Sequence, residues 1–187
     1  MLSDCVLEGK ARGEVSRLNV PVLRPKDAPL VPRLRKLGIT MPIRMLVAAH
    51  KAAIPPSLAA SVLMQETSGG ANIFGHDTTI FVGAGEVTKS KYLAYKKQRG
   101  PKGEGGMQGV GPLQLTFFTL QDKADERGGC WKPYVNMLVG FEHLADNIRR
   151  GGMHEGVKAY NGSGEKAEKY ANTVLPRADE FKQVLGR

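Results

Sequence analysis

The chain has 187 residues, which is enough for one well-buried domain and too few for two of full size. Apolar residues make up 41% and charged residues 24%, a balance that excludes a wholly disordered chain, and two cysteines are too few for a disulfide scaffold. The formal net charge of +9 suits a polyanionic partner such as nucleic acid, an anionic membrane surface or a bacterial cell wall, and charge alone does not choose among them.

The sequence pattern contains neither a membrane span nor a secretory signal. No run approaches the ~18 consecutive apolar residues of a membrane span. The N-terminus carries an early acid, Asp4, and lacks the apolar core that a secretory signal requires. We therefore expect no membrane span, no export by the usual route, and free thiols at Cys5 and Cys130 in a reducing compartment.

The first 38 residues differ from the rest in composition. Prolines recur there at short intervals among basic residues, at positions 21, 25, 29 and 32. Prolines at this density oppose both helix formation and strand pairing, so residues 1–38 are predicted to form an extended arm or linker. Residues 39–187 are predicted to form a single domain.

Helical periodicity begins at Thr40, which can cap a helix that runs to about residue 52. Pro55 and Pro56 end that helix and open a second one over residues 57–67. One face of the second helix is apolar and is closed by a carboxylate, with the spacing i, i+3, i+4 and i+7: Ala59, Val62, Leu63 and Glu66.

After residue 70 the pattern is irregular before it becomes helical again. Residues 88–98 predict a helix with Tyr92, Leu93 and Tyr95 on or near its buried side, and six glycines over residues 100–111 predict a turning loop. The later elements are a short extended piece over residues 110–115 and helices over 116–127, 136–151 with Asn136 as its cap, 153–160, and from 165 with a kink or break at Pro176. The expected fold class is mostly α, with room for one small β-hairpin in the middle.

Glu66 is the most informative single position. It ends an apolar stripe, so its carboxyl is expected to be partly buried. Burial disfavours the carboxylate and raises the pKa, which a general acid that works near neutral pH requires. The same position suits a boundary glutamate that only accepts a hydrogen bond from nearby backbone, and spacing alone leaves both interpretations open.

Three short motifs occur in order along the chain: Glu66-Thr67-Ser68-Gly69-Gly70, then Gly111-Pro112-Leu113-Gln114, then Ala159-Tyr160-Asn161-Gly162. Together they resemble the catalytic domain of goose-type lysozymes and soluble lytic transglycosylases (glycoside hydrolase family 23), whose motifs run Glu-Ser, Gly-Leu-Met-Gln and Ala-Tyr-Asn. The likeness extends from about Thr40 to the C-terminus. The phrases at residues 72–77 and 109–116 look like the versions found in phage cell-wall lysins. The resemblance implies a lysozyme-like domain with a central cleft.

The resemblance also implies a role for each matching residue. Glu66 matches the catalytic acid, and Gln114 matches the glutamine that lines the cleft beside the reacting sugars. Tyr160 and Asn161 match the third motif, in which the tyrosine hydroxyl can hold the catalytic glutamate in place. Thr67 stands where the family has a serine; it keeps the hydroxyl and adds a methyl group. It is included among the expected substrate-binding residues.

A second carboxylate decides the reaction type. A water-using, inverting glycosidase needs one ~6.5–9.5 Å from the acid, whereas transglycosylases dispense with it because the sugar's own 6-hydroxyl attacks. Asp77, in a loop that leaves the catalytic helix, is the candidate; Glu86 is a weaker alternative, and His76 is a neighbouring substrate-binding candidate. Asp77 suits a local Asx turn equally well, so hydrolysis and transglycosylation both stay open.

Several other features are interpreted as structural. The four histidines lack metal-ligand spacing, so neither a metal nor a cofactor is expected. Trp131 suits either a sugar-stacking platform or, more simply, the core. A basic run suits either a solvated face or a surface for an acidic polymer, and its members are Lys89, Lys91, Lys96, Lys97, Arg99 and Lys102.

With this resemblance, the sequence predicts a muramidase of the phage lysin type that cleaves the β-1,4 bond between N-acetylmuramic acid and N-acetylglucosamine, with Glu66 as general acid. The alternatives are a lytic transglycosylase that forms 1,6-anhydro products and a non-catalytic module that binds the wall or nucleic acid. The expected partner is bacterial peptidoglycan rather than nucleic acid, and the expected state is a monomer. The expected location is the host cytoplasm before lysis, or the virion.

Overall fold

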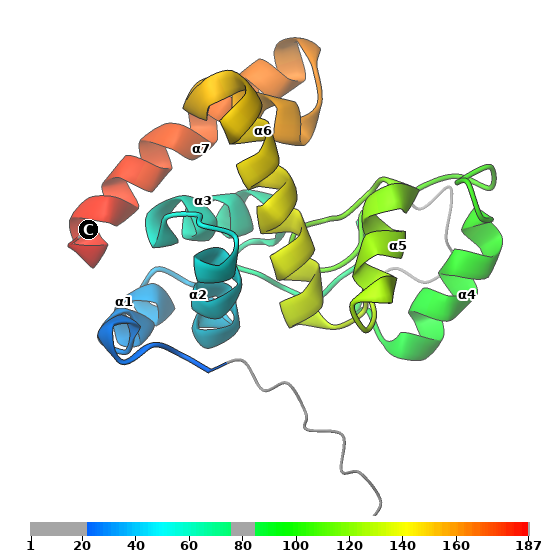
Figure 1. The fold of residues 1–187 in the computed structure, drawn as a ribbon, viewed down its shortest axis with the longest axis horizontal. Helices are drawn as coiled ribbons and strands as arrows, with labels where there is room; N and C mark the ends of the chain where they lie inside the picture. The colour runs from blue at the N-terminus through cyan, green and yellow to red at the C-terminus, as the bar shows by residue number, and fades with distance from the viewer. Residues whose placement is uncertain (1–21, 76–84, 187) are drawn as a thin grey trace, which may run out of the picture.

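Helices make up most of the chain that the computed structural model describes, which is residues 22–75 and 85–186 (Figure 1). Within these residues the elements are η1 Pro25–Asp27, α1 Leu30–Lys36, α2 Pro42–Lys51, α3 Pro56–Thr67, α4 Lys89–Arg99, α5 Phe118–Glu126, α6 Pro133–Asn161 and α7 Gly164–Leu185. The predicted mostly α class is confirmed. In place of the small hairpin, the described chain forms two isolated antiparallel bridges, Ile73 with Glu86 and Phe74 with Val110.

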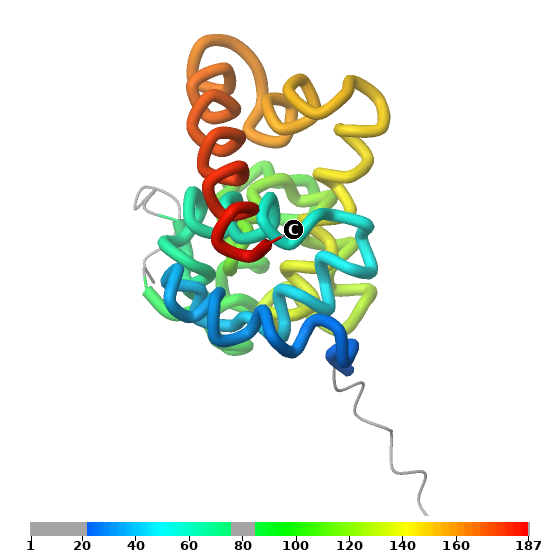
Figure 2. Tube along the Cα trace, turned by 90° about the vertical axis from the view of Figure 1, so that its left-hand side faces the viewer, coloured from blue at the N-terminus to red at the C-terminus, as the bar shows by residue number. Residues whose placement is uncertain are grey.

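The long helix α6 divides the molecule into two groups of helices (Figure 1). On one side, α2 and α3 pack on each other, α2 also packs on α6, and α7 packs on both α3 and α6. On the other side lie α4 and α5. Figure 2 shows the second half of α6 and the first half of α7 rising together above the other helices. The core between α2, α3, α6 and α7 is formed by fully buried apolar side chains, among them Met45, Ala48, Leu63, Phe141, Leu144 and Val174.

The predicted extended arm is wrong for residues 22–38, and residues 1–21 lie outside the described chain. The segment forms η1 and α1, and the α1 side chains Leu30 and Leu34 are buried in the core. The prolines permit this because Pro29 precedes the helix and Pro32 lies in its first turn. Backbone N–H groups in a first turn have no partner within the helix, so a proline there removes no helical hydrogen bond.

The start of α2 also differs from the prediction. Met41, not Thr40, is the residue at its N-cap. The Thr40 hydroxyl instead donates to the carbonyl oxygen of Gly69 at 3.1 Å, and the Thr40 N–H donates to the same oxygen at 3.0 Å. Thr40 therefore ties the chain before α2 to the turn after α3.

The helix α4 begins as predicted, because the Thr88 hydroxyl accepts a hydrogen bond from the Lys91 N–H at 3.3 Å and caps it. Tyr92 and Tyr95 are buried, but Leu93 is 48% exposed and was wrongly placed on the buried side. The buried face of α4 is centred on the two tyrosines and on Arg99, and Leu93 projects away from it.

The helix α6 begins at Pro133, so Asn136 lies inside it rather than capping it. Gly152, with φ of 79° and ψ of 177°, interrupts the helical backbone where the sequence predicted a break. The helix α7 continues through Pro176, which is exposed, while Val174 and Ala178 on either side of it are buried. Within the described residues, no helix is both long enough and apolar enough to cross a membrane.

Candidate active site

Glu66 lies in the last turn of α3, and glycine specifies the turn that follows. Ser68 ends the helix in the left-handed conformation, with φ of 52°, and Gly69 follows with φ of 105°. A Cβ atom on Gly69 would overlap the carbonyl oxygen of Gly38, so only glycine allows these two chain segments to cross so closely. The end of α3 that carries Glu66 is therefore packed against the segment before α2.

A cleft of about 200 Å³ opens beside Glu66. Its lining comes from α3, from the segment between Val110 and α5 with the first turns of α5, and from α6: Glu66, Leu113, Gln114, Leu115, Thr116, Phe117, Leu120, His143, Tyr160 and Asn161. The fold thus brings the three motifs together, because Glu66, Gln114 and the Tyr160–Asn161 pair all line the same cleft.

The Glu66 carboxyl is half-buried and accepts a hydrogen bond from the Tyr170 hydroxyl, which is 2.5 Å from Oε1. Burial raises the pKa of Glu66 from 4.5 to about 7, and the hydrogen bond from Tyr170 opposes part of that rise. The expectation of a partly buried glutamate with a raised pKa is therefore confirmed. The carboxyl is partly protonated at neutral pH, and Oε2 is the oxygen that Tyr170 leaves free.

The Tyr160 hydroxyl donates its hydrogen bond to the carbonyl oxygen of Leu113, at 2.9 Å, and not to Glu66, so its predicted role of holding the carboxyl is wrong in this structure. The Tyr160 ring stacks on Tyr170, with 6.3 Å between centroids and 30° between planes, and the His143 ring lies 5.8 Å away. Burial, and next the charge of Glu66, raises the pKa of the Tyr160 hydroxyl. Tyr160 therefore supports Tyr170, which holds the acid.

The second motif forms a tight turn at the edge of the cleft. Val110 and Leu115 exchange backbone hydrogen bonds, and Gln114 sits between them in the left-handed conformation, with φ of 46°. The Gln114 amide nitrogen donates to the carbonyl oxygens of Ile73 at 3.0 Å and Gly111 at 2.9 Å. Gln114 thus lines the cleft and also ties the turn to the segment after α3.

Asn136 and Thr67 hold this turn in place through hydrogen bonds to its backbone. Asn136 accepts a hydrogen bond from the Leu113 N–H at 3.0 Å and donates to the Val110 carbonyl at 2.8 Å. The Thr67 hydroxyl donates to the Pro112 carbonyl at 2.8 Å, and Thr67 is buried. The predicted contact of Thr67 with substrate is therefore wrong, because its hydroxyl is used inside the protein.

The described residues do not place a second carboxylate beside Glu66. Asp77 and His76 both lie outside the described residues. Glu86, the weaker alternative, is exposed and its backbone bridges to Ile73. Among the described residues that line the cleft, Glu66 is the only carboxylate.

Three residues of the site were missed in the sequence. Tyr170 was not singled out from the last predicted helix, and His143 was considered only as a metal ligand. Burial, and next the charge of Arg150, lowers the pKa of His143, so its ring in the cleft is neutral at pH 7. Phe117, at the N-cap of α5, is 56% exposed and lines the cleft as an open aromatic surface.

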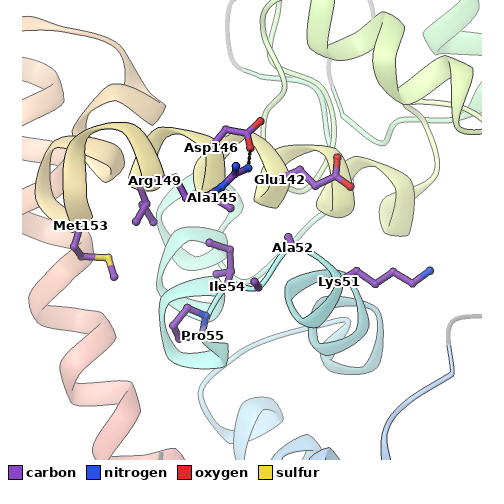
Figure 3. A pocket seen from close by; sticks show the side chains of 11 residues that line it. Lys51, Ala52, Ile54, Pro55, Glu142, Ala145, Asp146, Arg149 and Met153 are labelled. Atoms are coloured by element: carbon purple, nitrogen blue, oxygen red, sulfur yellow. Dashed lines mark hydrogen bonds and ion pairs between the residues drawn. The ribbon is translucent and has the colours of Figure 1, made fainter.

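The larger cavity, of about 540 Å³, lies between the α2–α3 turn and another face of α6 (Figure 3). Its acidic groups are already engaged, since Asp146 bonds to Arg149 and Glu142 bonds to Arg127. None of the three motifs contributes a residue to its lining. The smaller cleft is therefore the candidate active site.

Two further features do not belong to the cleft. His154, Glu155 and Glu168 bring ligand atoms within 4.8 Å of one another, but the Lys158 ammonium lies 2.7 Å from Glu168 and 3.7 Å from Glu155 and serves as their cation. Trp131 is half-buried against Tyr92, with 5.6 Å between ring centroids, and does not line the cleft.

Comparison of the chain with known protein families, with curated proteins and with solved structures finds no match. The arrangement of the described residues is therefore what any assignment of function must rest on.

Proposed function

We propose that this protein is a peptidoglycan-degrading glycosidase that cleaves the β-1,4 bond between N-acetylmuramic acid and N-acetylglucosamine. The observation that carries the proposal is the Glu66 carboxyl, which is half-buried at the edge of a cleft, has a pKa of about 7 and accepts a hydrogen bond from Tyr170. Cleavage of a glycosidic bond needs a protonated acid at the leaving oxygen, and burial keeps this carboxyl protonated near neutral pH.

Glu66 acts as the general acid. Tyr170 occupies Oε1, so Oε2 carries the proton and delivers it to the glycosidic oxygen as the bond from that oxygen to the anomeric carbon breaks. The positive charge that develops on the sugar is stabilised by the carboxylate that remains. Phe117 offers a ring against which a sugar can pack, and the neutral His143 offers a hydrogen-bonding group in the same cleft.

Hydrolysis is the reaction that we propose, with Asp77 as the group that activates water. A lytic transglycosylase is the second candidate, because its reaction needs one carboxylate and Glu66 is the only one among the described cleft residues. In that reaction the 6-hydroxyl of the muramic acid attacks its own anomeric carbon and closes a 1,6-anhydro ring. The setting that fits either reaction is a phage lysin that degrades the bacterial wall.

Digestion of purified peptidoglycan by the wild type and by Glu66→Gln tests the proposal. We expect the wild type to release muropeptides. The variant should release them at least ~10²–10⁴-fold more slowly, because a general acid accelerates the reaction by about that factor. Mass spectrometry of the products separates the two reactions, since hydrolysis leaves reducing muramic acid ends and transglycosylation leaves 1,6-anhydro ends. Wild-type protein that releases no products, or a variant as active as the wild type, contradicts the proposal.

A further inference from the structure

The helix α4 and the loop after it carry a concentration of positive charge that the cleft does not use. Between Lys89 and Lys102 the chain has six basic residues and no acidic one. None of the described residues that line the cleft belongs to α4. The charge of this segment therefore needs an explanation of its own.

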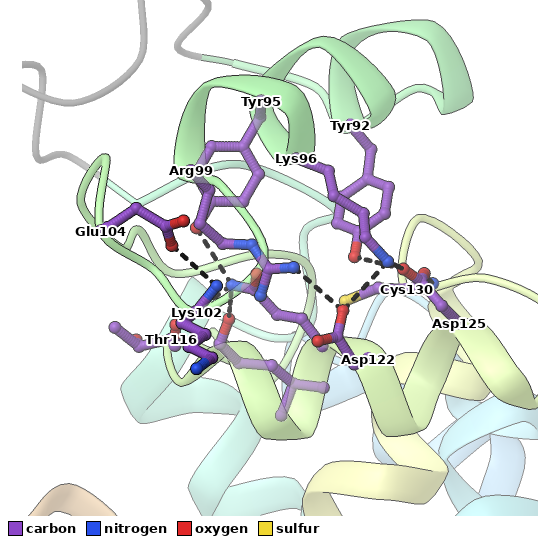
Figure 4. A network of polar contacts seen from close by, with 12 residues as sticks. Tyr92, Tyr95, Lys96, Arg99, Lys102, Glu104, Thr116, Asp122, Asp125 and Cys130 are labelled. Carbon is purple, nitrogen blue, oxygen red and sulfur yellow. Dashed lines mark hydrogen bonds and ion pairs between the residues drawn. The ribbon is translucent and has the colours of Figure 1, made fainter.

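Two of the six basic groups form ion pairs within the fold (Figure 4). Lys96 lies 3.0 Å from Asp122 and 2.6 Å from Asp125, both on α5. Arg99 is completely buried, and its guanidinium lies 2.9 Å from Asp122. These contacts join α4 to α5, and they use the acids that face α4 from its neighbouring helix.

The other lysines of α4 point to solvent. Lys89, Lys91 and Lys97 are exposed, and among the described residues none of them has an ion-pair partner. Lys89 and Lys97 stand two turns apart on one ridge of the helix, about 12 Å at 1.5 Å per residue. Lys132 extends the group, because Lys89 Nζ and Lys132 Nζ lie 5.5 Å and 6.0 Å from the centroid of the same Trp131 ring. Lys91, two residues from Lys89, projects from another side of α4, so we call only Lys89, Lys97 and Lys132 the α4 lysine face.

The contacts with the Trp131 ring stabilise Lys89 and Lys132 locally, but helix stability does not account for the lysines at the start of α4. Lys89 and Lys91 occupy the first turn of α4, which contains no acidic residue. The N-terminus of a helix carries a partial positive charge, so lysines there weaken the helix. Lys97 lies in the last turn, where the dipole favours a cation, so it is the charge at the start of α4 that the helix does not explain.

We propose that the α4 lysine face binds a flexible, linear phosphodiester polymer of the cell wall. Its charges are all ammonium groups, which act as point charges and lack the fork with which arginine selects one anionic group in fixed geometry. Tyr92 and Tyr95 are buried and Trp131 lies beneath two ammonium groups, so the face offers no open ring for base stacking, which favours a polymer without bases. The choice of a wall polymer rests on the proposed function.

Because the face and the cleft share no described residue, one protein can hold the polymer and keep the cleft open for the glycan. The attachment is electrostatic, so it weakens as salt screens the charges. Binding of this kind concentrates the protein at the wall without adding contacts at the bond that is cleaved.

Isothermal titration calorimetry of the full chain with poly(glycerol phosphate), at a series of salt concentrations, tests the inference. The variant Lys89→Gln/Lys97→Gln/Lys132→Gln is compared with a matched control, Lys36→Gln/Lys166→Gln/Lys182→Gln, in which three exposed lysines elsewhere are changed. We expect the face variant to bind at least tenfold more weakly at low salt and its log–log salt slope to fall by about 2, since each phosphate that a lysine neutralises adds about 0.7 to the slope. The control is expected to keep most of its affinity, and circular dichroism verifies the fold of both.

Equal losses in the two variants would show that net charge alone attracts the polymer, and they would overturn the assignment of the face. Tighter binding of single-stranded DNA than of poly(glycerol phosphate) at the same salt would overturn the choice of polymer. The test is independent of catalysis, because Glu66→Gln is expected to bind the polymer as the wild type does. Binding without release of muropeptides contradicts the proposed function and leaves the face in place.

Discussion

Replacing Glu66 by glutamine tests the burial of its carboxyl without reference to any enzymatic activity. In the folded protein the pKa of Glu66 is raised from 4.5 to about 7. Between these pH values the folded protein keeps a proton that the unfolded chain has released, so the free energy of unfolding falls as pH rises. At about 1.4 kcal/mol per pKa unit, the folded state is weakened by about 3 kcal/mol at pH values above both.

Glutamine removes this titration and keeps an oxygen that can accept the Tyr170 hydroxyl. We therefore expect the free energy of unfolding of Glu66→Gln, measured against that of the wild type, to grow by about 3 kcal/mol between pH 4 and pH 8. Urea denaturation at steps of pH gives both curves, and the titrations of all other groups cancel in their difference. Glu180→Gln, a change at an exposed position on α7, controls for the loss of one negative charge. A difference between Glu66→Gln and wild type that stays constant across this range would refute the argument.

The remaining predictions concern the groups that support the acid. Tyr170→Phe removes the hydrogen bond that lowers the pKa of Glu66, so the alkaline limb of the pH–activity profile on wall suspensions should move to higher pH; a limb that stays in place would contradict this. Tyr160→Phe loses the bond to Leu113 and should cost about 1 kcal/mol in urea denaturation, with an unchanged pH–activity profile; a shifted profile would restore a direct role for its hydroxyl. Asn136→Ala leaves the buried Leu113 N–H without a partner and removes one of the two hydrogen bonds to the Val110 carbonyl, so it should cost about 2–4 kcal/mol; a cost below 1 kcal/mol would show that the turn does not depend on it.

The elements that could be predicted from the sequence are those specified by local chemistry. Pro56 opens α3, and Ser68 with the following glycines ends it, as the order of these residues indicates. The apolar spacing that ends in Glu66 predicted a partly buried carboxyl, and the structure has one. The helix break at Gly152 was equally visible, because no side chain restrains the backbone there.

The errors arose where packing between distant segments decides the outcome. Asn136 precedes an apolar run and so suits an N-cap, but docking of the 110–115 turn makes it the partner of two backbone groups. Tyr170 has the spacing of a core residue, and nothing near it in the sequence indicates that its hydroxyl reaches Glu66. Leu93 is apolar by composition, yet Tyr92 and Tyr95 fix the buried face of α4 and turn Leu93 outward.

The hydrogen bond between Tyr170 and Glu66 joins residues 104 positions apart. Synthesis proceeds from the N-terminus, so the whole of α3 leaves the ribosome before Tyr170 is added. Until α7 packs on α3, the Glu66 carboxyl lacks its hydrogen bond from Tyr170 and the burial that Tyr170 supplies. The environment that sets the pKa of Glu66 is therefore complete only after α7 has been synthesised and has docked on α3.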